Sequence, residues 1–119
     1  MDALDVHELG ERFDVALCFG ILHRVTDPIA LLQVLAGMLT PGGEIVLETY
    51  GSRLPAGCPS IEVHEPGYVY ARDDFVYWGF PPEGLRRLGH IVGLDNVEIV
   101  DQPEIDSHPR ILALLRTAG

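Results

Sequence analysis

The sequence from Phe13 to Tyr50, FDVALCFGILHRVTDPIALLQVLAGMLTPGGEIVLETY, decides the fold of this chain. It opens with an unbroken apolar run, residues 15–19, which is typical of a parallel strand that is covered on both faces. Gly20 ends the run, and a glycine there lets the chain turn and lets a ligand approach the backbone closely. This stretch therefore predicts a buried strand that ends in a ligand-accessible turn.

A helix is expected next, with Asp27 as N-cap and Pro28 at the first helical position. Apolar residues at helical spacing between Leu31 and Leu39 predict the face that it buries. The Pro-Gly-Gly turn at 41–43 predicts the end of the helix, and residues 45–47 predict a second buried strand. A crossover of this length joins parallel strands right-handedly.

The carboxyl ends of parallel strands are where such sheets bind ligands, so residues 18–24 and 48–50 are expected to carry the chemistry. Nothing earlier in the sequence can pair with the first strand, whose free edge is therefore expected to be bare. Either a partner covers this edge or the chain is a fragment.

Composition excludes several classes of protein. The 119 residues, 47% hydrophobic and 22% charged, suit one soluble domain, and no apolar run could cross a membrane. The N-terminal residues are acidic and polar, unlike a secretory signal, so a cytoplasmic location is expected. The net charge of -10 argues against nucleic acid as a partner of this chain alone. Cys18 and Cys58 match no zinc spacing, and neither a metal site nor a disulfide is expected.

Residues 51–80 predict a long loop that lies over the carboxyl ends of the two strands. Most of the aromatic residues fall in or beside it, and they either cover one side of the sheet or form the walls of a substrate pocket. Residues 61–64 and 67–70 alternate in polarity and are candidates for a small hairpin. The acidic residues near His64 have no metal-ligand spacing.

A second helix is expected from Pro81, with Gly84 and Gly89 either weakening it or making room for a neighbour. Gly93 is a natural helix stop, and two further strands are predicted. These strands are residues 97–100 and 111–115.

Several of these segments resemble one known superfamily. They are Phe13-Asp14, Gly20-Ile21-Leu22, Asp27-Pro28, Pro41-Gly42-Gly43 and Leu47-Glu48-Thr49. Together they resemble the second half of a class I S-adenosylmethionine-dependent methyltransferase. Within that superfamily, the closest resemblance is to the wobble-uridine tRNA methyltransferase and carboxymethyltransferase family.

The resemblance implies an α/β fold with a partial Rossmann-like methyltransferase sheet. Its strands would run in the order four, five, seven, six, with the last strand antiparallel. The N-terminal half of the fold would be absent, including the Gly-rich loop and the acid that binds the ribose. Residues 1–119 would form a single partial domain, with 51–80 as its substrate-side loop.

The resemblance also implies site residues. Those on the cofactor side are Asp2, Ala3, Cys18, Phe19, Gly20 and His23. Those on the substrate side are Arg24, Tyr50, Tyr68, Tyr70 and Tyr77. S-adenosylmethionine would bind only together with the missing half, so tight binding to the isolated chain is not expected.

Alternatives remain open for several of these residues. Asp2 reads equally as an ordinary N-terminal residue and Phe19 as a plain core residue. His23 is a candidate base, because neutral imidazole suits proton removal near pH 7, or a structural histidine held by hydrogen bonds. The family commonly has an aromatic residue followed by histidine at this place, whereas this chain has His23-Arg24.

Three functions are weighed. The first is the C-terminal half of a methyltransferase, inactive alone, whose acceptor is a tRNA or a small molecule. The second is a non-catalytic module that binds itself, as a homodimer, or a complementing chain through the open edge of the first strand. The third is an α/β enzyme of unrelated chemistry.

Overall fold

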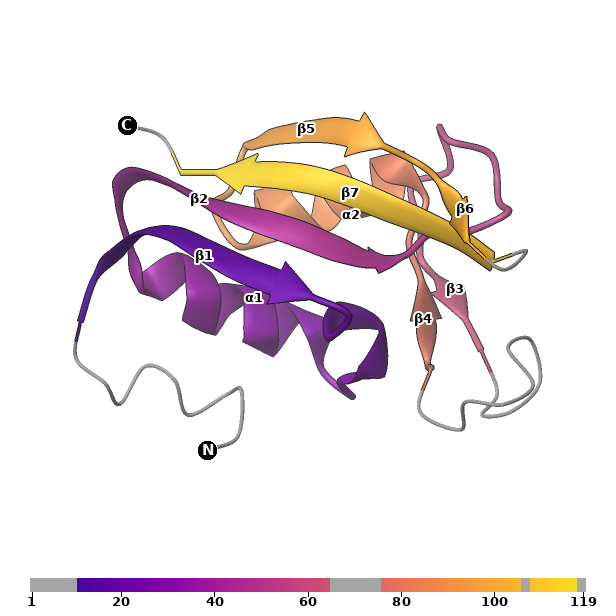
Figure 1. The fold of residues 1–119 in the computed structure, drawn as a ribbon, viewed down its shortest axis with the longest axis horizontal. Coiled ribbons are helices and arrows are strands. Elements are labelled where there is room, and N and C mark those ends of the chain that lie inside the picture. Colours follow the sequence, from indigo (N-terminus) through magenta and orange to yellow (C-terminus); the bar gives the residue numbers. More distant parts are fainter. Residues whose placement is uncertain (1–10, 65–75, 106–107, 118–119) are drawn as a thin grey trace.

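A mixed β-sheet forms the centre of the molecule in the computed structural model, which describes residues 11–64, 76–105 and 108–117. The main strands are β1 (Phe13–Phe19), β2 (Leu39–Tyr50), β5 (Asn96–Asp101) and β7 (His108–Arg116), and they lie in the order β1-β2-β7-β5 (Figure 1). β1 runs parallel to β2, and β7 runs antiparallel to both β2 and β5. The α/β class and the reversed last strand are thus confirmed.

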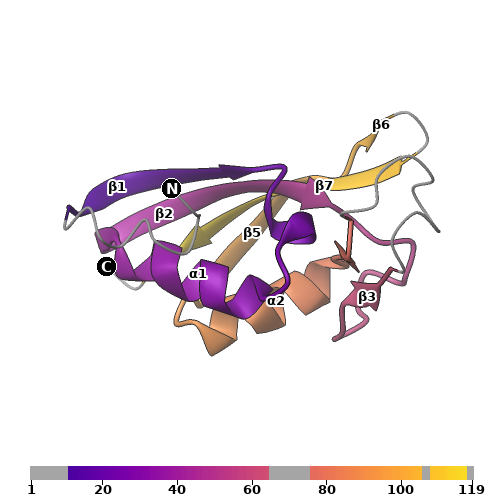
Figure 2. The ribbon, with the colours of Figure 1, turned by 90° about the horizontal axis from the view of Figure 1, so that it is seen from below.

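Both α-helices, α1 (Pro28–Gly37) and α2 (Pro82–Ile91), pack on the same face of this sheet (Figure 2). Side chains from alternate strand positions meet them there and form the core. Its fully buried members include Leu22, Leu31, Leu32, Ile45, Leu47, Phe80, Leu85, Leu94, Ile111 and Leu115. No helix in the described part of the chain is long and apolar enough to cross a membrane.

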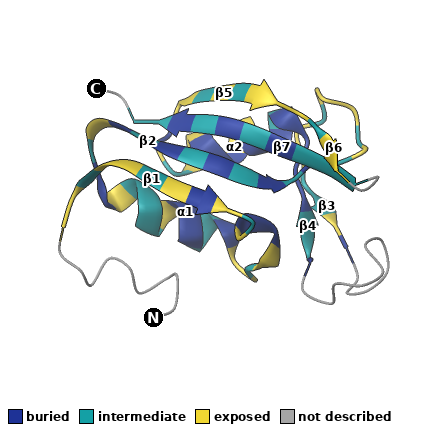
Figure 3. Ribbon diagram, viewed as in Figure 1, coloured by how far each residue is buried: buried dark blue, intermediate teal, exposed yellow. Residues whose placement is uncertain are grey.

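The opposite face of the sheet is not covered by the described residues. Val15, Leu17 and Phe19 of β1 are 49%, 65% and 51% exposed on this side (Figure 3). Leu17 lies beside Val46 of β2, which in turn pairs with Leu114 of β7. We call this surface the open face. The prediction that the first strand is covered on both faces is therefore wrong for this chain, because only the helix side of β1 has a packing layer.

The helix and the second strand meet earlier than the sequence suggests. Asp27 caps α1 as predicted, its carboxylate accepting a hydrogen bond from the Ala30 amide at 2.9 Å. However, β2 already begins at Leu39, so the Pro-Gly-Gly segment at 41–43 lies inside the strand and does not end the helix. Leu39 pairs with Phe13 before the register shifts, and Gly42 takes the positive φ of 76° that this irregularity requires.

Glycines in α2 do make room for neighbours. A side chain at Gly84 would lie 1.9 Å from the carbonyl oxygen of Ser60, and one at Gly89 would lie 2.7 Å from Cγ2 of Val97. Gly93 ends the helical segment with a φ of 83°, as predicted. The close approach of α2 to its neighbours therefore depends on bare backbone.

Candidate functional site

The carboxyl ends of β1 and β2 lie side by side, as a parallel pair requires. The Gly20 amide donates a hydrogen bond to the Glu48 carbonyl oxygen at 2.9 Å, which extends the pairing one residue past β1. Gly20 has a φ of 67°, and a side chain there would meet no atom within 4 Å. The backbone at this turn is thus open to a ligand, as the sequence predicts.

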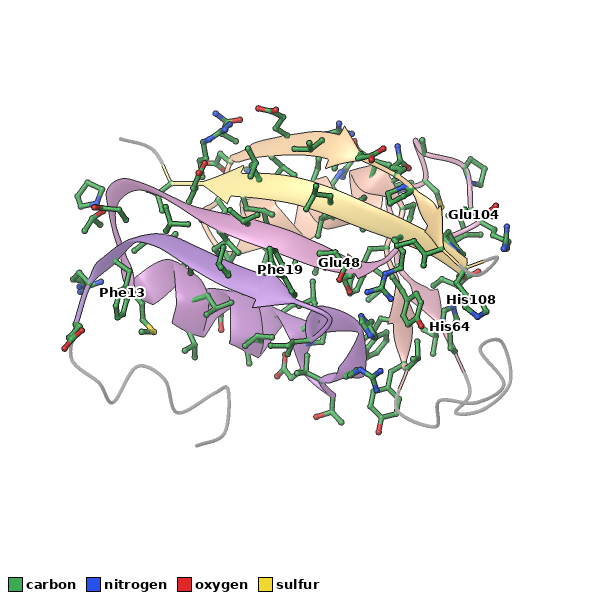
Figure 4. The ribbon with its side chains drawn as sticks, in the orientation of Figure 1. Phe13, Phe19, Glu48, His64, Glu104 and His108 are labelled. Atoms are coloured by element: carbon green, nitrogen blue, oxygen red, sulfur yellow. The ribbon has the colours of Figure 1, made fainter. Side chains whose placement is uncertain are left out.

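Phe19 and Cys18, the two residues before this turn, point to opposite faces of the sheet. Phe19 is half exposed on the open face, so its reading as a plain core residue is wrong (Figure 4). Cys18 is buried on the helix side, and burial raises the pKa of its thiol from 9.0 to about 11. Only the backbone of Cys18 can therefore face a ligand at the turn, whereas Phe19 presents an aromatic ring.

His23 lies in the short 3₁₀ helix η2 (Leu22–Arg24), where it is 1% exposed. Its Nδ1 lies 2.8 Å from the Thr49 hydroxyl and accepts a longer hydrogen bond, 3.4 Å, from the Tyr50 amide. A backbone N–H can only donate, so Nδ1 is the acceptor nitrogen and Nε2 carries the proton of the neutral ring. The acceptor nitrogen is thus engaged within the protein, which favours a structural part for His23. Its candidate role as a base stays a prediction.

Tyr50 ends β2 between two polar neighbours. Its ring meets that of His23 edge-on at 4.4 Å between centroids, and the Arg110 guanidinium lies 4.2 Å from its centre. Arg110 also donates to both carboxylate oxygens of Glu48, at 2.5 and 2.7 Å. This partly buried bidentate pair fixes the guanidinium over the ring. No local pattern predicts this ion pair, because Glu48 and Arg110 meet only through the pairing of β2 with β7.

The described part of residues 51–80 lies against both strand ends. The Tyr77 amide donates to the His23 carbonyl oxygen at 2.8 Å, and the Trp78 indole donates to the Val25 carbonyl oxygen at 2.7 Å. The Phe80 amide donates to the Tyr50 carbonyl oxygen at 3.2 Å. This segment therefore lies over the predicted site. Arg24 is exposed in η2, and Asp2, Ala3, Tyr68 and Tyr70 lie outside the described residues.

Two short strand pairs were not predicted. β3 (Glu62–Val63) pairs with β4 (Trp78–Gly79). The predicted hairpin partner, residues 67–70, lies outside the described residues, so that hairpin stays a prediction. β6 (Glu104–Ile105) pairs with the start of β7, between the two predicted strands 97–100 and 111–115. Two-residue strands carry too short a pattern to be recognised in a sequence.

The hydrogen bond between buried His64 and partly exposed Glu62 is a feature that sequence reasoning did not predict. His64 is 4% exposed, and its Nε2 lies 2.8 Å from a carboxylate oxygen of Glu62. The His64 amide donates to the Tyr77 carbonyl oxygen, which ties the pair to the segment that holds η2. A side chain at Gly79 would lie 3.0 Å from the Glu62 carboxylate and 3.2 Å from the His64 ring. The pair therefore packs on the bare backbone of β4.

The Cys18 thiol makes stability sensitive to alkaline pH. Its folded-state pKa of about 11 lies above the ordinary value of 9.0, so the folded protein holds the proton more tightly than the unfolded chain. The contribution of this thiol to the free energy of unfolding is therefore constant below pH 9. It falls as the pH rises from 9 to 11, by up to about 3 kcal/mol. Urea unfolding at several pH values, compared with Cys18→Ala, measures this. Equal pH slopes for the two proteins would contradict the assignment.

Comparisons with known proteins agree with this geometry. A family model described as a methyltransferase domain matches residues 1–99. The tRNA U34 carboxymethyltransferase of Trichodesmium erythraeum is 34% identical over 67 residues, which are 56% of this chain and 20% of that protein. The same enzyme of Chromohalobacter salexigens is 33% identical over 92 residues, 77% of this chain and 26% of that protein. The chain thus spans a quarter or so of the length of these curated relatives.

Solved structures show the same fold. The 1,6-didemethyltoxoflavin-N1-methyltransferase of Burkholderia thailandensis, crystallised with S-adenosylhomocysteine, has a TM-score of 0.66 at 18% identity, over 91% of this chain and 45% of that one. The arsenic(III) S-adenosylmethionine methyltransferase of Chlamydomonas reinhardtii has a TM-score of 0.69 at 15% identity, over 100% of this chain and 42% of that one. The family model, the curated relatives and the shared fold agree: the chain belongs to the class I S-adenosylmethionine-dependent methyltransferase family and is related to its tRNA U34 carboxymethyltransferases.

Proposed function

We propose that this chain takes part in S-adenosylmethionine-dependent methyl transfer and supplies the acceptor side of the site together with the backbone that contacts the methionine part of the cofactor. The observation that carries this proposal is the open backbone at Gly20, next to the exposed ring of Phe19 and at the carboxyl ends of two parallel strands. Ligands of parallel sheets bind at this end. In this proposal, the cofactor-binding groups other than the turn at Gly20 come from outside residues 1–119.

The residues at the turn fit the methionine part of the cofactor. Gly20 leaves space for a ligand against the main chain, and a half-exposed aromatic ring beside it suits a ligand that carries a cation. When bound, S-adenosylmethionine supplies a methyl group on a sulfonium sulfur, a good leaving group that needs no dedicated base for every acceptor. The work of the chain is then positioning, which can contribute several kcal/mol to lowering the barrier.

Positioning comes from the hydrogen bonds that hold η2. The His23 ring is joined to Thr49 near the end of β2, and the His23 carbonyl oxygen accepts a hydrogen bond from the amide of Tyr77, the residue before β4. In this proposal the hydroxyls of Tyr50 and Tyr77 face the acceptor side and can hold a polar group of the acceptor. Arg24, exposed in the same 3₁₀ helix, is placed to receive an anionic group.

The acceptor is proposed to be a base of tRNA or a small molecule. Curated relatives that act on tRNA U34 support the first. The net charge of -10 supports the second, because phosphate backbones are bound by clustered basic residues. An NMR titration of the ¹⁵N-labelled protein distinguishes the two. Unmodified tRNA and free uridine are added separately in the presence of S-adenosylhomocysteine, and the acceptor is the one that shifts the amide signals of Arg24 and Tyr77.

Titration of the ¹⁵N-labelled chain with S-adenosylhomocysteine tests the cofactor position. We expect weak binding, with amide shifts concentrated at Phe19, Gly20 and His23. Gly20→Val should weaken this binding at least about tenfold, because it fills the open space and strains the positive φ. Gly57→Val is the control, since Gly57 lies in an exposed loop with no atom near the new side chain.

Two results would count against the proposal. One is a set of shifts centred on Arg53 and Gln102, in the polar cavity of about 470 Å³ that Arg110 also lines. The other is equal binding by the Gly20→Val and Gly57→Val proteins. Micromolar affinity of the isolated chain would also overturn the expectation that the rest of the cofactor site comes from elsewhere.

A non-catalytic binding module is the second candidate function. The observation in its favour is β1, which within the described part of the chain pairs only with β2 and presents apolar side chains at its other edge. Exposed apolar edges of this kind bind other strands. This candidate does not need the carboxyl ends of the strands, so variants at Gly20 leave it unaffected.

A further inference from the structure

The polar cavity of about 470 Å³ lies at the same end of the sheet as the turn at Gly20. Each of its three walls adjoins a strand. Residues 51–53 follow β2, residues 102–104 follow β5, and Pro109 and Arg110 lie near the start of β7. The cavity is therefore on the β2–β7–β5 side of the sheet, whereas β1 is at the other edge. Its volume is in the range of small-molecule sites.

Backbone hydrogen bonds hold the three walls together. The Gly51 amide donates to the Pro109 carbonyl oxygen at 2.9 Å, and the Arg110 amide donates to the Pro103 carbonyl oxygen at 2.8 Å. A side chain at Gly51 would lie 3.2 Å from the Arg110 carbonyl oxygen, so bare backbone is needed where the first wall meets β7. The cavity is thus formed by the chain itself, as small-molecule sites usually are.

The two arginines that line the cavity are each paired with a glutamate. Arg110 donates to both carboxylate oxygens of Glu48, and Arg53 Nη1 lies 2.9 Å from a carboxylate oxygen of Glu104. In Figure 4 both glutamates lie toward the end of the sheet at which β2 stops. The positive charge at the cavity is therefore balanced. A phosphate or carboxylate would be repelled by these glutamates, so the cavity favours an uncharged ligand.

Hydrogen-bonding groups of both kinds remain at the walls. The Arg110 guanidinium uses Nε and Nη2 for its glutamate, and neither its Nη1 nor the side-chain amide of Gln102 bonds to any described residue. Ser52 Oγ accepts from the Leu54 amide at 3.0 Å and keeps its own proton to donate. The Glu104 carboxylate adds an acceptor. An apolar ligand would leave these groups without partners, which is costly.

We propose that this cavity binds the uncharged, hydroxyl-bearing part of the methyl acceptor, a sugar ring. A hydroxyl group both donates and accepts, so neighbouring hydroxyls on a ring match walls where donors stand beside acceptors. The ring belongs either to a nucleoside or to a free sugar. This inference rests on the proposed function, because it takes the compound in the cavity to be the acceptor.

Tyr50 connects the cavity with the proposed site of methyl transfer. The centre of its ring is 4.2 Å from the Arg110 guanidinium, which lines the cavity, and 4.4 Å from the centre of the His23 ring, in the 3₁₀ helix that follows Gly20. A compound whose sugar ring occupies the cavity therefore has only Tyr50 to pass on its way to the turn. The cavity would select the compound, and the turn would receive the methyl donor.

Titration of the ¹⁵N-labelled chain with uridine and, separately, with methyl β-D-glucopyranoside tests the cavity without a cofactor. We expect shifts at the amides of Gly51, Arg53, Gln102 and Glu104, and the compound that causes them identifies the source of the ring. The same compound without two neighbouring hydroxyls, as 2′,3′-dideoxyuridine or the 2,3-dideoxyglucoside, should bind at least about tenfold more weakly, because hydrogen bonds to charged groups are lost.

Glu104→Gln tests why an uncharged ligand is favoured. It removes one negative charge from the wall, so inorganic phosphate should bind at least about fivefold more tightly than it binds to the native chain. Glu98→Gln is the matched control. The side chain of Glu98 is 55% exposed, against 59% for Glu104, and it also pairs with an arginine, but it does not line the cavity. Phosphate should bind to this variant as it binds to the native chain.

Three results would overturn the inference. Phosphate that shifts the cavity amides of the native chain at lower concentration than either sugar compound would make this an anion site. Equal binding of the dideoxy compound would mean that the hydroxyls are not recognised. Absence of shifts at the cavity with both sugar compounds would show that it holds no sugar ring.

Failure of this inference and failure of the proposed function give different results. S-adenosylhomocysteine also carries a ribose, so where a sugar compound binds, the cofactor titration is repeated in its presence. Shifts at Gly20 without any sugar in the cavity would contradict this inference alone. A sugar in the cavity without any cofactor shift at Gly20 would contradict the proposed function, while the assignment of a sugar ring to the cavity would stand.

Discussion

Replacing Gly84 with alanine is expected to lower the free energy of unfolding by about 3 kcal/mol, near the upper end of the cost of overpacking. The new methyl carbon would lie 1.9 Å from the carbonyl oxygen of Ser60 and 2.9 Å from its carbonyl carbon. Both atoms belong to the main chain, so no change of rotamer can relieve the clash. Either α2 or the loop at Ser60 must move. Urea unfolding followed by circular dichroism measures the loss.

Gly37→Ala is the matched control for this variant. Gly37 is also the residue of an α-helix, the last of α1, but a side chain there would meet no atom within 4 Å. Alanine should therefore leave stability unchanged or raise it by up to about 1 kcal/mol, through better helix propensity and a less flexible unfolded chain. Equal losses in the two variants would mean that helix propensity, and not the contact with Ser60, sets the cost.

Phe80→Ala is expected to cost about 4 kcal/mol, in the range found for buried aromatic residues. Phe80 is fully buried, and its backbone pairs with Gly51 directly after β2. The variant should also loosen the segment that covers the candidate site, because the buried Phe80 ring anchors the segment whose amides bond to the carbonyl oxygens of Tyr50 and His23. Faster hydrogen exchange of the Tyr77 amide, which is bound to His23, would report this loosening.

Phe19→Ala removes the same side chain from a half-exposed position, so it is the natural comparison. Its cost should stay near 1 kcal/mol, since about half of the ring is already in contact with water. Exchange of the Tyr77 amide should not change. If Phe19→Ala proved as costly as Phe80→Ala, the open face would have to be covered in solution by a partner or by a second copy.

Local signals predicted most of the helical layer and the strand ends. Asp27 caps α1 and Gly93 takes the left-handed conformation, because capping and helix termination depend on a few neighbouring residues. The turn at Gly20 was predicted for the same reason, since an apolar run followed by glycine describes both the strand and its end. The turn at Gly20, at the end of β1, could thus be predicted from the sequence.

The contacts between side chains around the candidate site could not be predicted from the sequence. Glu48 and Arg110 are joined only when β7 enters the sheet beside β2, and no spacing rule links them. β3 pairs with β4, and Phe80, directly after β4, bridges to Gly51 at the end of β2, so this pairing depends on contacts between residues far apart in sequence. The exposed side of β1 was also missed, because an apolar run looks the same whether or not a second layer covers it.

The place of β7 has a consequence for how the chain folds. β7 is the last described strand along the sequence, yet it lies between β2 and β5 and joins them. Until β7 has been synthesised, β1 with β2 and β5 with α2 are separate pieces that share no strand pairing. The sheet can therefore close only late in synthesis, through contacts between residues far apart in sequence, and such contacts form slowly. During that interval the edges of β2 and β5 that β7 later covers have unpaired backbone groups, and such edges favour aggregation.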